Sequence, residues 1–565
     1  MFKINHDLKF KYACLISLIF GAIVFFIKYV DLSSNNVLNP FYTDWIKNGS
    51  IDLKQHFWGW LFFKNDSWFF PLGNFESLSY PNKISVIYSD SIPLAAIIFK
   101  FVLKLFNYSG EFQFFGLWGL LCYILQSYFG FIISRKFFKS NILSLISGIL
   151  FCLIPAFCAK MFLHTALASH WVILYVLSLL LWIKSVSRFK LYKKILLFSL
   201  IGIFCAGIHM YFIPICLILI FAYCILDILL NRLKGIKNLS AFLPLLVFAF
   251  SCSILLYIEG AFVSNIKIND SISPLYGCFN QTGHATFCFL NSIKVNPQFN
   301  SDMLDFFIPC ECLFSNKVCI DNFCWIGSGI FILFLFSLFL IKKRYIKFDS
   351  PFLFVFCLVF LIFYLIAILP EIRFLERAYL KICFSESSLI NHFLSIFRFN
   401  SRFNFVNIYL ILIFILYIIS KIEYKKASII ILLALLIQSC DLYKFINKNF
   451  MFLTFEKNNT NRFEKLDEFA FKNNVINVSK YVFSIYPCSD ITIDICNYAF
   501  KNNLKLTDFY FARTFDKSKY INYFKYKLKH SSKGDVFMFS KKYKIPDYIK
   551  CSKYVQYGDF SFCQI

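Results

Sequence analysis

Charged residues are scarce in this sequence. Only 16% of its 565 residues are charged, whereas 59% are hydrophobic and 77 are phenylalanine. A soluble globular domain does not need that much apolar surface, and apolar runs approaching the ~20 residues that cross a bilayer recur along the chain. The composition therefore excludes an ordinary soluble protein and predicts an all-α polytopic membrane protein.

Negative charge is the scarcer of the two signs. The chain has 32 Asp and Glu against 58 Lys and Arg, a formal net charge of +26. In a soluble protein such an excess would suggest a nucleic-acid partner. Here the basic residues fall mostly in short loops between apolar runs, where they report the orientation of the spans. We expect a lipid bilayer as the partner, and no nucleic acid.

No small-residue cleavage site follows the first apolar run, which extends from Cys14 to Val30 after three lysines. This run therefore predicts an uncleaved anchor with a cytoplasmic N-terminus. With it, the pattern predicts about eleven transmembrane helices. The further apolar runs lie near 113–134, 141–158, 166–184, 195–210, 212–230, 241–258, 325–341, 351–369, 403–420 and 427–440.

The segment from Ile92 to Phe106 is apolar but short, and it carries Lys100 and Lys104. If this segment crossed the membrane, every later basic loop would face outward. If it is a helix in the outer interface, all of those loops face the cytoplasm, as the positive-inside rule requires. We therefore predict interfacial helices in the first exported loop and a C-terminus outside.

This topology divides the chain into a transmembrane domain, 1–446, and an exported domain, 447–565. The loops 31–112, 259–324 and 370–402 are exported as well. The tail is polar and lysine-rich, and "SKYVFSIYP", "DITIDICNYAFKNN" and "KGDVFMFSKKY" read as strand, helix and strand. We expect a small α/β domain. The tail lacks a glycine-rich phosphate loop and a nucleophile elbow, and so carries no catalytic motif of its own.

Cysteines occur in even numbers in two exported regions, where thiols oxidise, and this favours disulfides. A zinc site at "CEC", Cys310 to Cys312, is the alternative, although the spacing matches no standard ligand pattern. The candidates are Cys278, Cys288, Cys310, Cys312, Cys319 and Cys324 in the loop, and Cys488, Cys496, Cys551 and Cys563 in the tail.

Polar residues from four distant segments share the predicted outer face. Carboxylates, imidazoles and guanidinium groups that meet there are typical of an active site at the interface, and not of a conduction path. The first loop contributes Asp44, Asp52, His56 and Asp90; later junctions contribute Lys160, His164, His170, His209, Arg398 and Arg402.

Six motifs occur in a fixed order: "NPFYTDWIKNGSIDLKQHFWGWLFFKNDSWFFPLG", "YSDSIPL", "FQFFGLW", "HTALASHWVIL", "IHMYF" and "FRFNSRF". Together they resemble a bacterial membrane-protein family of unknown function allied to the GT-C superfamily. Members of that superfamily are membrane glycosyltransferases that take sugars from polyprenyl-phosphate carriers. The resemblance covers most of residues 38–440. It implies a GT-C-like fold in the bacterial cytoplasmic membrane and transfer of a sugar to a glycan, lipid or protein acceptor.

Such a transfer needs a carboxylate as general base and cations on the departing phosphate. Asp52, Asp90 and then Asp44 are the candidate carboxylates, with His56 beside them. Two or three aspartates suit a divalent cation as well as a metal-free base, so the cofactor stays open. The candidates for donor-phosphate binding are Arg402, Arg398, His164, His170, His209 and Lys160.

Several of these residues have a structural alternative. Asp52 and His56 are four apart and suit a local helical pair. Asp90 suits a helix cap, and His209 a structural hydrogen bond. Trp58, Trp60 and Trp68 suit anchors at the headgroups. Two other functions also stay open: a lipid or polysaccharide transporter or flippase, and a non-catalytic scaffold for envelope polymer assembly.

Overall fold

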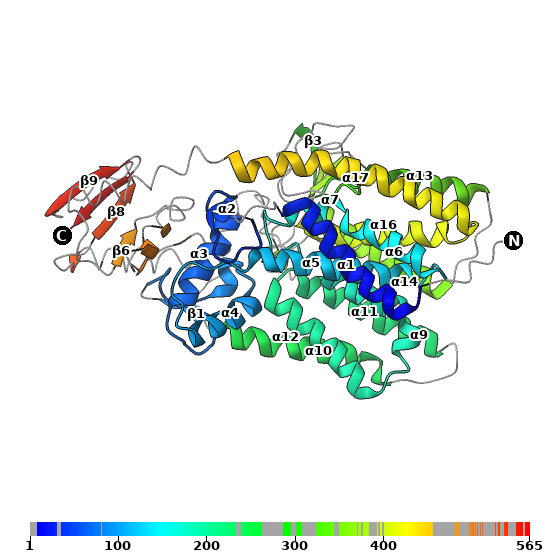
Figure 1. Ribbon diagram of the computed structural model, residues 1–565, viewed down its shortest axis with the longest axis horizontal. Helices are drawn as coiled ribbons and strands as arrows, with labels where there is room; N and C mark the ends of the chain where they lie inside the picture. The colour runs from blue at the N-terminus through cyan, green and yellow to red at the C-terminus, as the bar shows by residue number, and fades with distance from the viewer. Residues whose placement is uncertain are drawn as a thin grey trace.

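The computed structural model is a bundle of long helices whose two ends differ (Figure 1). Short helices and loops gather at one end, and a five-stranded sheet lies beyond them. The structure describes residues 8–30, 36–80, 82–232, 239–262, 286–294, 301–307, 324–343, 350–369, 371–374, 377–383, 400–455 and 481–484, with short stretches within 393–397 and 496–564.

Each predicted apolar run coincides with a helix. Among the residues that the structure describes, seven helices are long and apolar enough to cross a membrane: α1, α5, α10, α11, α14, α16 (extended by the 3-10 turn η4) and α17. The chain is therefore a multi-pass membrane protein, while eleven spans remain a prediction. The bounds are α1 Phe10–Tyr29, α5 Phe115–Ser134, α6 Asn141–Cys152, α8 Trp171–Leu181, α10 Leu191–Ile208, α11 Phe212–Arg232, α12 Leu243–Glu259, α13 Ser328–Lys343, α14 Ser350–Ile368, η4 Asn400–Phe403, α16 Asn404–Ile419 and α17 Tyr424–Phe455.

Close helix approach in the bundle depends on small residues. A Cβ on Gly21 of α1 would lie 2.4 Å from the carbonyl oxygen of Tyr123 in α5. A Cβ on Gly130 of α5 would lie 2.8 Å from the carbonyl oxygen of Gly148 in α6. Helices in lipid associate mainly through such close backbone packing, because burial of apolar surface gives little advantage there. These glycines hold α1, α5 and α6 together.

The short elements form the end of the bundle that carries the candidate site. They are α2 Asp44–Lys47, α3 Ile51–Asn65, β1 Asn74–Phe75, β2 Ile84–Ser85, η1 Val86–Ser89, α4 Pro93–Leu105 and α7 Pro155–Lys160; α9 Ile183–Val186 and η2 Leu239–Phe242 lie elsewhere. The 13 residues of α4 span about 20 Å, short of the ~30 Å hydrocarbon core. The predicted interfacial segment is thus a helix, and it packs beside α3 and α10.

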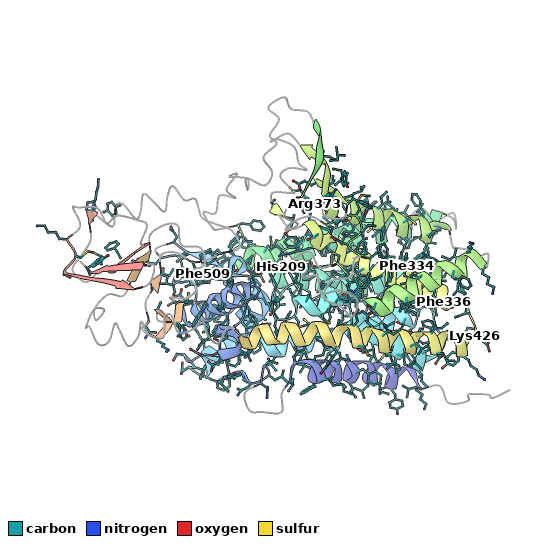
Figure 2. The ribbon with its side chains drawn as sticks, turned by 90° about the horizontal axis from the view of Figure 1, so that it is seen from above. His209, Phe334, Phe336, Arg373, Lys426 and Phe509 are labelled. Carbon is teal, nitrogen blue, oxygen red and sulfur yellow. A yellow bond between two sulfur atoms is a disulfide. The ribbon has the colours of Figure 1, made fainter. Side chains whose placement is uncertain are left out.

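The other end of the bundle carries the N-terminus and α9, which marks the basic connection after α8 (Figure 1). Lys426, in the first turn of α17, lies at this same end, whereas His209 lies toward the opposite one (Figure 2). Basic turns and the N-terminus therefore share one end, as a cytoplasmic assignment of that end requires.

This arrangement predicts the topology. A reporter fused after Lys139 should read cytoplasmic, and one fused after Phe455, at the end of α17, should read exported. Phosphatase and fluorescent-protein fusions measure the two outcomes directly. An exported signal after Lys139 would mean that α4 crosses the membrane, and would place the histidines described below on the wrong side.

The tail forms a mixed sheet with the order β7-β6-β8-β10-β9. Its first three strands are parallel neighbours, and β8, β10 and β9 pair antiparallel. Two predicted strands correspond to β6 and β8, but the predicted domain boundary at 446/447 falls inside α17, which continues to Phe455. The bounds are β6 Tyr481–Ser484, β7 Lys505–Leu506, β8 Val536–Ser540, β9 Lys553–Tyr557 and β10 Phe560–Gln564.

A second sheet joins two of the predicted exported loops. Strand β3 (Thr286–Lys294) pairs with β5 (Arg377–Cys383), which also pairs with β4 (Glu371–Phe374), all antiparallel. These strands follow α12 and α14 in the chain. The described strands of the loops 259–324 and 370–402 therefore lie together, a relation that the sequence did not predict.

The predicted disulfides are confirmed at one pair. Cys551 and Cys563 are bonded and link β10 to the start of β9. Cys324 is a correction: it is a buried free thiol that lies 3.8 Å from Ser401 O, because the chain turns inward there before α13. Cys496 is buried in the core. Only the backbone of Cys288 is described, and Cys278, Cys310, Cys312, Cys319 and Cys488 lie outside the described residues.

The tail docks on the first loop. Phe500 packs against Trp58 and Phe62 of α3, with ring centroids 6.2 and 5.8 Å apart. Leu506 donates its backbone N–H to Ser77 O and accepts one from Tyr80 N. Lys505 pairs with Glu76. The side of α3 that carries Trp58 is therefore covered by protein.

Candidate active site and its histidine cluster

Helix α3 begins at a serine cap. Ser50 Oγ accepts the N–H of Leu53 at 3.2 Å, and Asp52 lies in the first turn, where its charge suits the helix dipole. His56 follows one turn later and is fully buried. A Cβ on Gly59 would lie 2.3 Å from Ser89 Cβ, so α3 packs directly against η1. This contact brings His56 to the start of "DSIPL".

Asp90 lies in a strained turn between η1 and α4. Its φ is +52°, and that of Ile92 is +53°, in the left-handed region that a β-branched residue rarely adopts. Such a position costs on the order of 1–3 kcal/mol and is typical of functional sites. Ser91 Oγ fixes the turn by donating to His56 O at 2.6 Å. The turn therefore holds the Asp90 carboxylate beside His56, and the residue at the N-cap of α4 is Ile92 and not Asp90.

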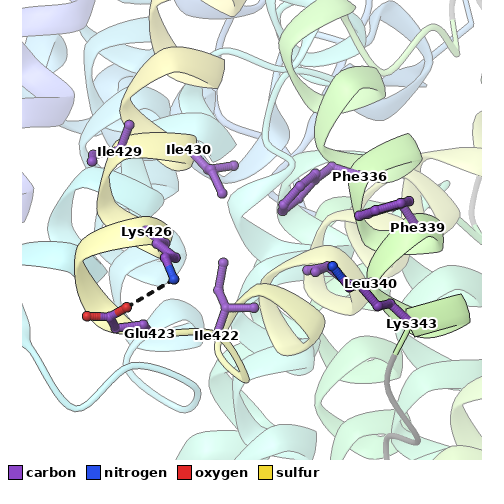
Figure 3. A pocket seen from close by; sticks show the side chains of 9 residues that line it. All are labelled: Phe336, Phe339, Leu340, Lys343, Ile422, Glu423, Lys426, Ile429 and Ile430. Atoms are coloured by element: carbon purple, nitrogen blue, oxygen red, sulfur yellow. Dashed lines mark ion pairs between the residues drawn. The ribbon is translucent and has the colours of Figure 1, made fainter.

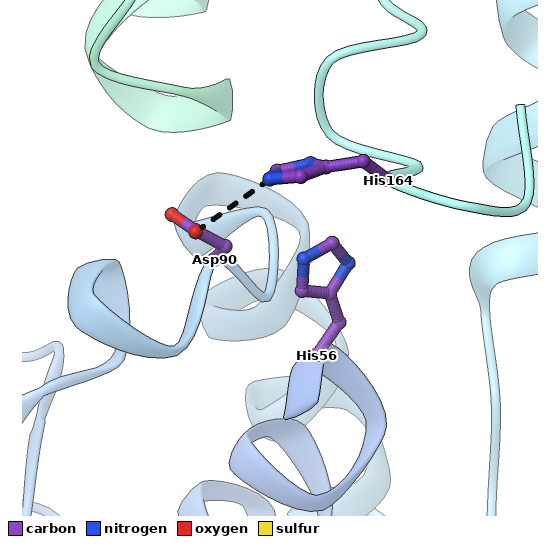
Figure 4. A group of neighbouring side chains, drawn as sticks. All are labelled: His56, Asp90 and His164. Carbon is purple, nitrogen blue, oxygen red and sulfur yellow. Dashed lines mark ion pairs between the residues drawn. The ribbon is translucent and has the colours of Figure 1, made fainter. Parts of the chain in front are cut away.

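Two further histidines face this carboxylate. His164, from the irregular connection between α7 and α8, places Nε2 3.8 Å from Asp90 Oδ2 (Figure 4). His209, between α10 and α11, places Nε2 3.6 Å from Asp90 Oδ1. The ring centroids of His56 and His164 are 4.7 Å apart. We name His56, Asp90, His164 and His209 the histidine cluster; all three imidazoles are buried.

Burial sets the charge state of two of these imidazoles. Burial, with a smaller effect of the nearby Arg402 charge, lowers the pKa of His56 to about 3. Burial also lowers the pKa of His164 well below its ordinary value, with His56 and Arg402 adding to the effect. Both rings are neutral at pH 7. The contact of His164 with Asp90 is therefore not an ion pair. The distance of 3.8 Å between Nε2 and Oδ2 is also longer than a hydrogen bond.

The cluster includes atoms that can bind a cation. His56, Asp90 and His164 each offer one ligand atom, and these atoms all lie within 4.8 Å of one another. Among the described residues, both ring nitrogens of His56 and Nδ1 of His164 have no hydrogen-bond partner. Buried polar atoms are normally satisfied. An unsatisfied ring nitrogen of His56 that lies within 4.8 Å of an Asp90 carboxylate oxygen and a His164 ring nitrogen can therefore take part in binding a ligand.

Two cations lie near the cluster. Arg402, buried in η4, stacks over Tyr211 with its guanidinium carbon 4.7 Å from the ring centroid. Its charge acts on both His56 and His164, and the charge of Lys160 acts on His164. The predicted grouping of Arg402 and Lys160 with the histidines is thus present. Arg398 lies outside the described residues.

The remaining predicted residues lie in different places. Asp52 is half-buried one turn before His56. Asp44 is exposed on α2. Partial burial of Tyr42 raises the pKa of its hydroxyl, and the charge of Asp44 raises it further. His170 contacts Tyr409 OH at 2.8 Å through Nδ1, and so faces α16.

Trp58 and Trp60, which suited anchors at the headgroups, are buried in the protein. Trp58 is 3% exposed and Trp60 is fully buried, and Trp60 Nε1 donates to Phe112 O at 2.8 Å. They are core residues of α3, because the tail and the segment before α5 cover them. Trp68 is 37% exposed and lies under the Lys100 ammonium at 4.5 Å.

Ser91 and Tyr211 position the cluster but were not among the predicted residues. Each adjoins a predicted residue, in "YSDSIPL" and "IHMYF", and that adjacency is the signal that would have found them. Tyr211 supports Arg402 with its ring and donates its N–H to His209 Nδ1 at 3.2 Å.

A groove at the opposite end of the bundle lies between α13 and α17 (Figure 3). Its volume is about 400 Å³ and its lining is mainly apolar, with an exposed pair between Lys426 and Glu423 at 3.3 Å. The histidine cluster does not contribute to its lining. We therefore place the candidate chemistry at the cluster.

The helices and the cluster define a multi-pass membrane protein with a buried histidine–carboxylate site. The chain belongs to the family described as "Domain of unknown function (DUF6311)", whose model matches residues 18–443. Among solved structures it is similar to the apo oligosaccharyltransferase of Archaeoglobus fulgidus, with a TM-score of 0.44 and 11% identity over 94% of this chain and 70% of that chain. A TM-score below 0.5 does not define a shared fold. A search of curated proteins gave no match.

Proposed function

We propose that this protein transfers a sugar from a polyprenyl-phosphate donor to a cell-envelope acceptor at the outer face of the cytoplasmic membrane. One observation supports this most: Asp90, three imidazoles and the charges of Arg402 and Lys160 meet at one end of an apolar helical bundle. A carboxylate near fixed cations suits a reaction that removes a proton from one partner and leaves charge on the other.

The reaction assigns a role to each group. Asp52 takes the proton of the acceptor hydroxyl, and the hydroxyl oxygen forms a bond to the anomeric carbon. The bond from that carbon to the phosphate oxygen breaks, and its electron pair leaves with the phosphate. Arg402 holds the departing phosphate, because a guanidinium binds two oxygens at once. Asp90 positions the acceptor or a metal ion.

The membrane position suits the donor. The cluster lies at the end of the bundle that carries α3 and α4, and the long helices beside it are apolar (Figures 1 and 2). A polyprenyl chain can lie along such helices in the bilayer while its phosphate reaches the interface. A GT-C-like fold, which the sequence motifs indicate, is the architecture we propose for this arrangement.

Envelope glycan profiling by mass spectrometry tests the function. A strain that lacks this gene should lose one sugar from an envelope glycan and accumulate the corresponding lipid-linked sugar. The wild-type gene should restore the profile, and a variant without the catalytic carboxylate should not. Restoration by that variant would favour a scaffold. An unchanged profile, with unchanged lipid-linked sugars, would contradict the proposal.

A further inference from the structure

The histidine cluster contains ring nitrogens, on His56 and His164, that lack hydrogen-bond partners among the described residues. Catalysis by a carboxylate does not explain them. His56 is fully buried, and among the described residues neither of its ring nitrogens has a hydrogen-bond partner. Figure 4 shows its ring beside Asp90 and His164. An unpaired buried polar group destabilises the folded state. A cation bound at Asp90 would give His56 the partner that its ring nitrogens lack among the described residues.

We infer that His56, Asp90 and His164 bind a transition-metal ion of the zinc class and leave a coordination position open. The assignment rests on the donor atoms and their geometry, and it deepens the proposed function, in which Asp90 positions the acceptor or a metal ion. The three ligand atoms come from α3, the turn before α4 and the connection before α8. A metal here would therefore link three separate segments of the fold.

The distances suit a small ion after a modest closure. Metal–nitrogen and metal–oxygen bonds near 2.0–2.1 Å in a tetrahedron separate ligand atoms by about 3.4 Å. His164 Nε2 already lies 3.8 Å from Asp90 Oδ2, and no pair in the trio exceeds 4.8 Å. A rotation of the His56 ring and the Asp90 carboxylate would account for the difference.

The donor set selects the class of metal. Two imidazole nitrogens and one carboxylate oxygen suit zinc, cobalt, nickel, copper or ferrous iron. Magnesium and calcium prefer oxygen ligands, and magnesium keeps several waters. The buried imidazoles offer little to either ion. The site is therefore a transition-metal site, and not a magnesium site built from aspartates.

His209 is a positioning residue and not a fourth ligand. Its Nδ1 accepts the backbone N–H of Tyr211 at 3.2 Å, so in the neutral ring the proton is on Nε2. That proton faces Asp90 Oδ1 at 3.6 Å, while Oδ2 faces His164. Support of this kind orients a ligating carboxylate. Three protein ligands thus leave a position for water or substrate, as in catalytic metal sites.

The neighbouring charges indicate what the open position would take. Lys160 and Arg402 both act electrostatically on His164, and they would repel a second cation. An anionic oxygen bound to the metal would offset that repulsion. A phosphate group matches this combination of a metal ion, a guanidinium and an ammonium.

Cobalt titration of the purified full-length protein tests the site. Protein in detergent, stripped with a chelator, should bind one more equivalent of Co²⁺ than its Asp90→Asn variant, with visible d–d absorption from a nitrogen and oxygen site. Asp90→Asn and His164→Gln should each weaken Co²⁺ and Zn²⁺ binding by about a hundredfold or more, and His209→Gln by about ten- to a hundredfold.

His530→Gln is the matched control, because His530 is exposed in the tail and stacks only on Tyr526 among the described residues. It should bind cobalt as the wild type does. Zn²⁺ should raise the unfolding temperature of the wild type and of His530→Gln, but not of Asp90→Asn, and Mg²⁺ should not replace it. Equal cobalt binding by all variants, or equal protection by Mg²⁺, would overturn the proposal.

Discussion

Asp52→Asn should lower the rate of sugar transfer by about a hundredfold or more, while the protein keeps its fold. Asparagine has the shape of aspartate but cannot accept the acceptor proton. Asp52 is half-buried in the first turn of α3, one turn before His56, and asparagine keeps its size while it removes the charge that suits the helix dipole. Transfer by the purified protein from a polyprenyl-phosphate sugar measures the rate.

Glu423→Gln is the control for this experiment. It also neutralises one carboxylate, but Glu423 is 62% exposed at the opposite end of the bundle. Its rate should equal that of the wild type. Full activity of Asp52→Asn, together with loss of activity in Asp90→Asn, would assign the base to Asp90 and refute the role of Asp52.

Arg402→Lys should raise the KM for the lipid-linked donor by about tenfold to a hundredfold, because a lysine keeps the charge but loses the two-pronged hydrogen bond. The guanidinium carbon also lies over the Tyr211 ring, 4.7 Å from its centroid, a contact that a lysine ammonium would not reproduce in the same way. Initial rates at varied donor and fixed acceptor concentration separate this effect from a change in kcat.

Arg135→Lys provides the matched exchange. Arg135 follows α5 and donates to Asn141 Oδ1 at 2.6 Å, away from the histidine cluster. Its KM for the donor should stay at the wild-type value. A normal KM in Arg402→Lys would show that Arg402 does not bind the donor phosphate, whatever the outcome for Asp52.

The bundle could be predicted from the sequence because the hydrophobic signal is local. Each apolar run forms a helix. The positive-inside rule, applied to the basic loops, distinguished the short segment 92–106 from the long spans. The strands β3 and β5 could not be predicted, because their pairing joins residues about ninety positions apart. No local pattern encodes such a pairing.

The sequence predicted that the residues of the histidine cluster lie on the same face of the membrane. It did not predict which of them contact one another. His164 and His170 occur in one motif, "HTALASHW", and the sequence treats them alike. The connection between α7 and α8 is irregular, so no helical period indicates that His164 faces Asp90 and His170 faces Tyr409. The burial of Trp58 could not be predicted either, because the residue that packs against it, Phe500, is distant in the sequence.

That contact between Trp58 and Phe500 has a consequence for the order of synthesis. The first loop leaves the ribosome early, and the residue that covers it is made 442 positions later. At the usual 5–20 residues per second this is an interval of roughly 20 to 90 seconds. During that time α3 carries an uncovered tryptophan, and a chain that ends prematurely keeps it uncovered. The contact between Phe500 and Trp58 thus forms only in a chain whose synthesis has passed residue 500.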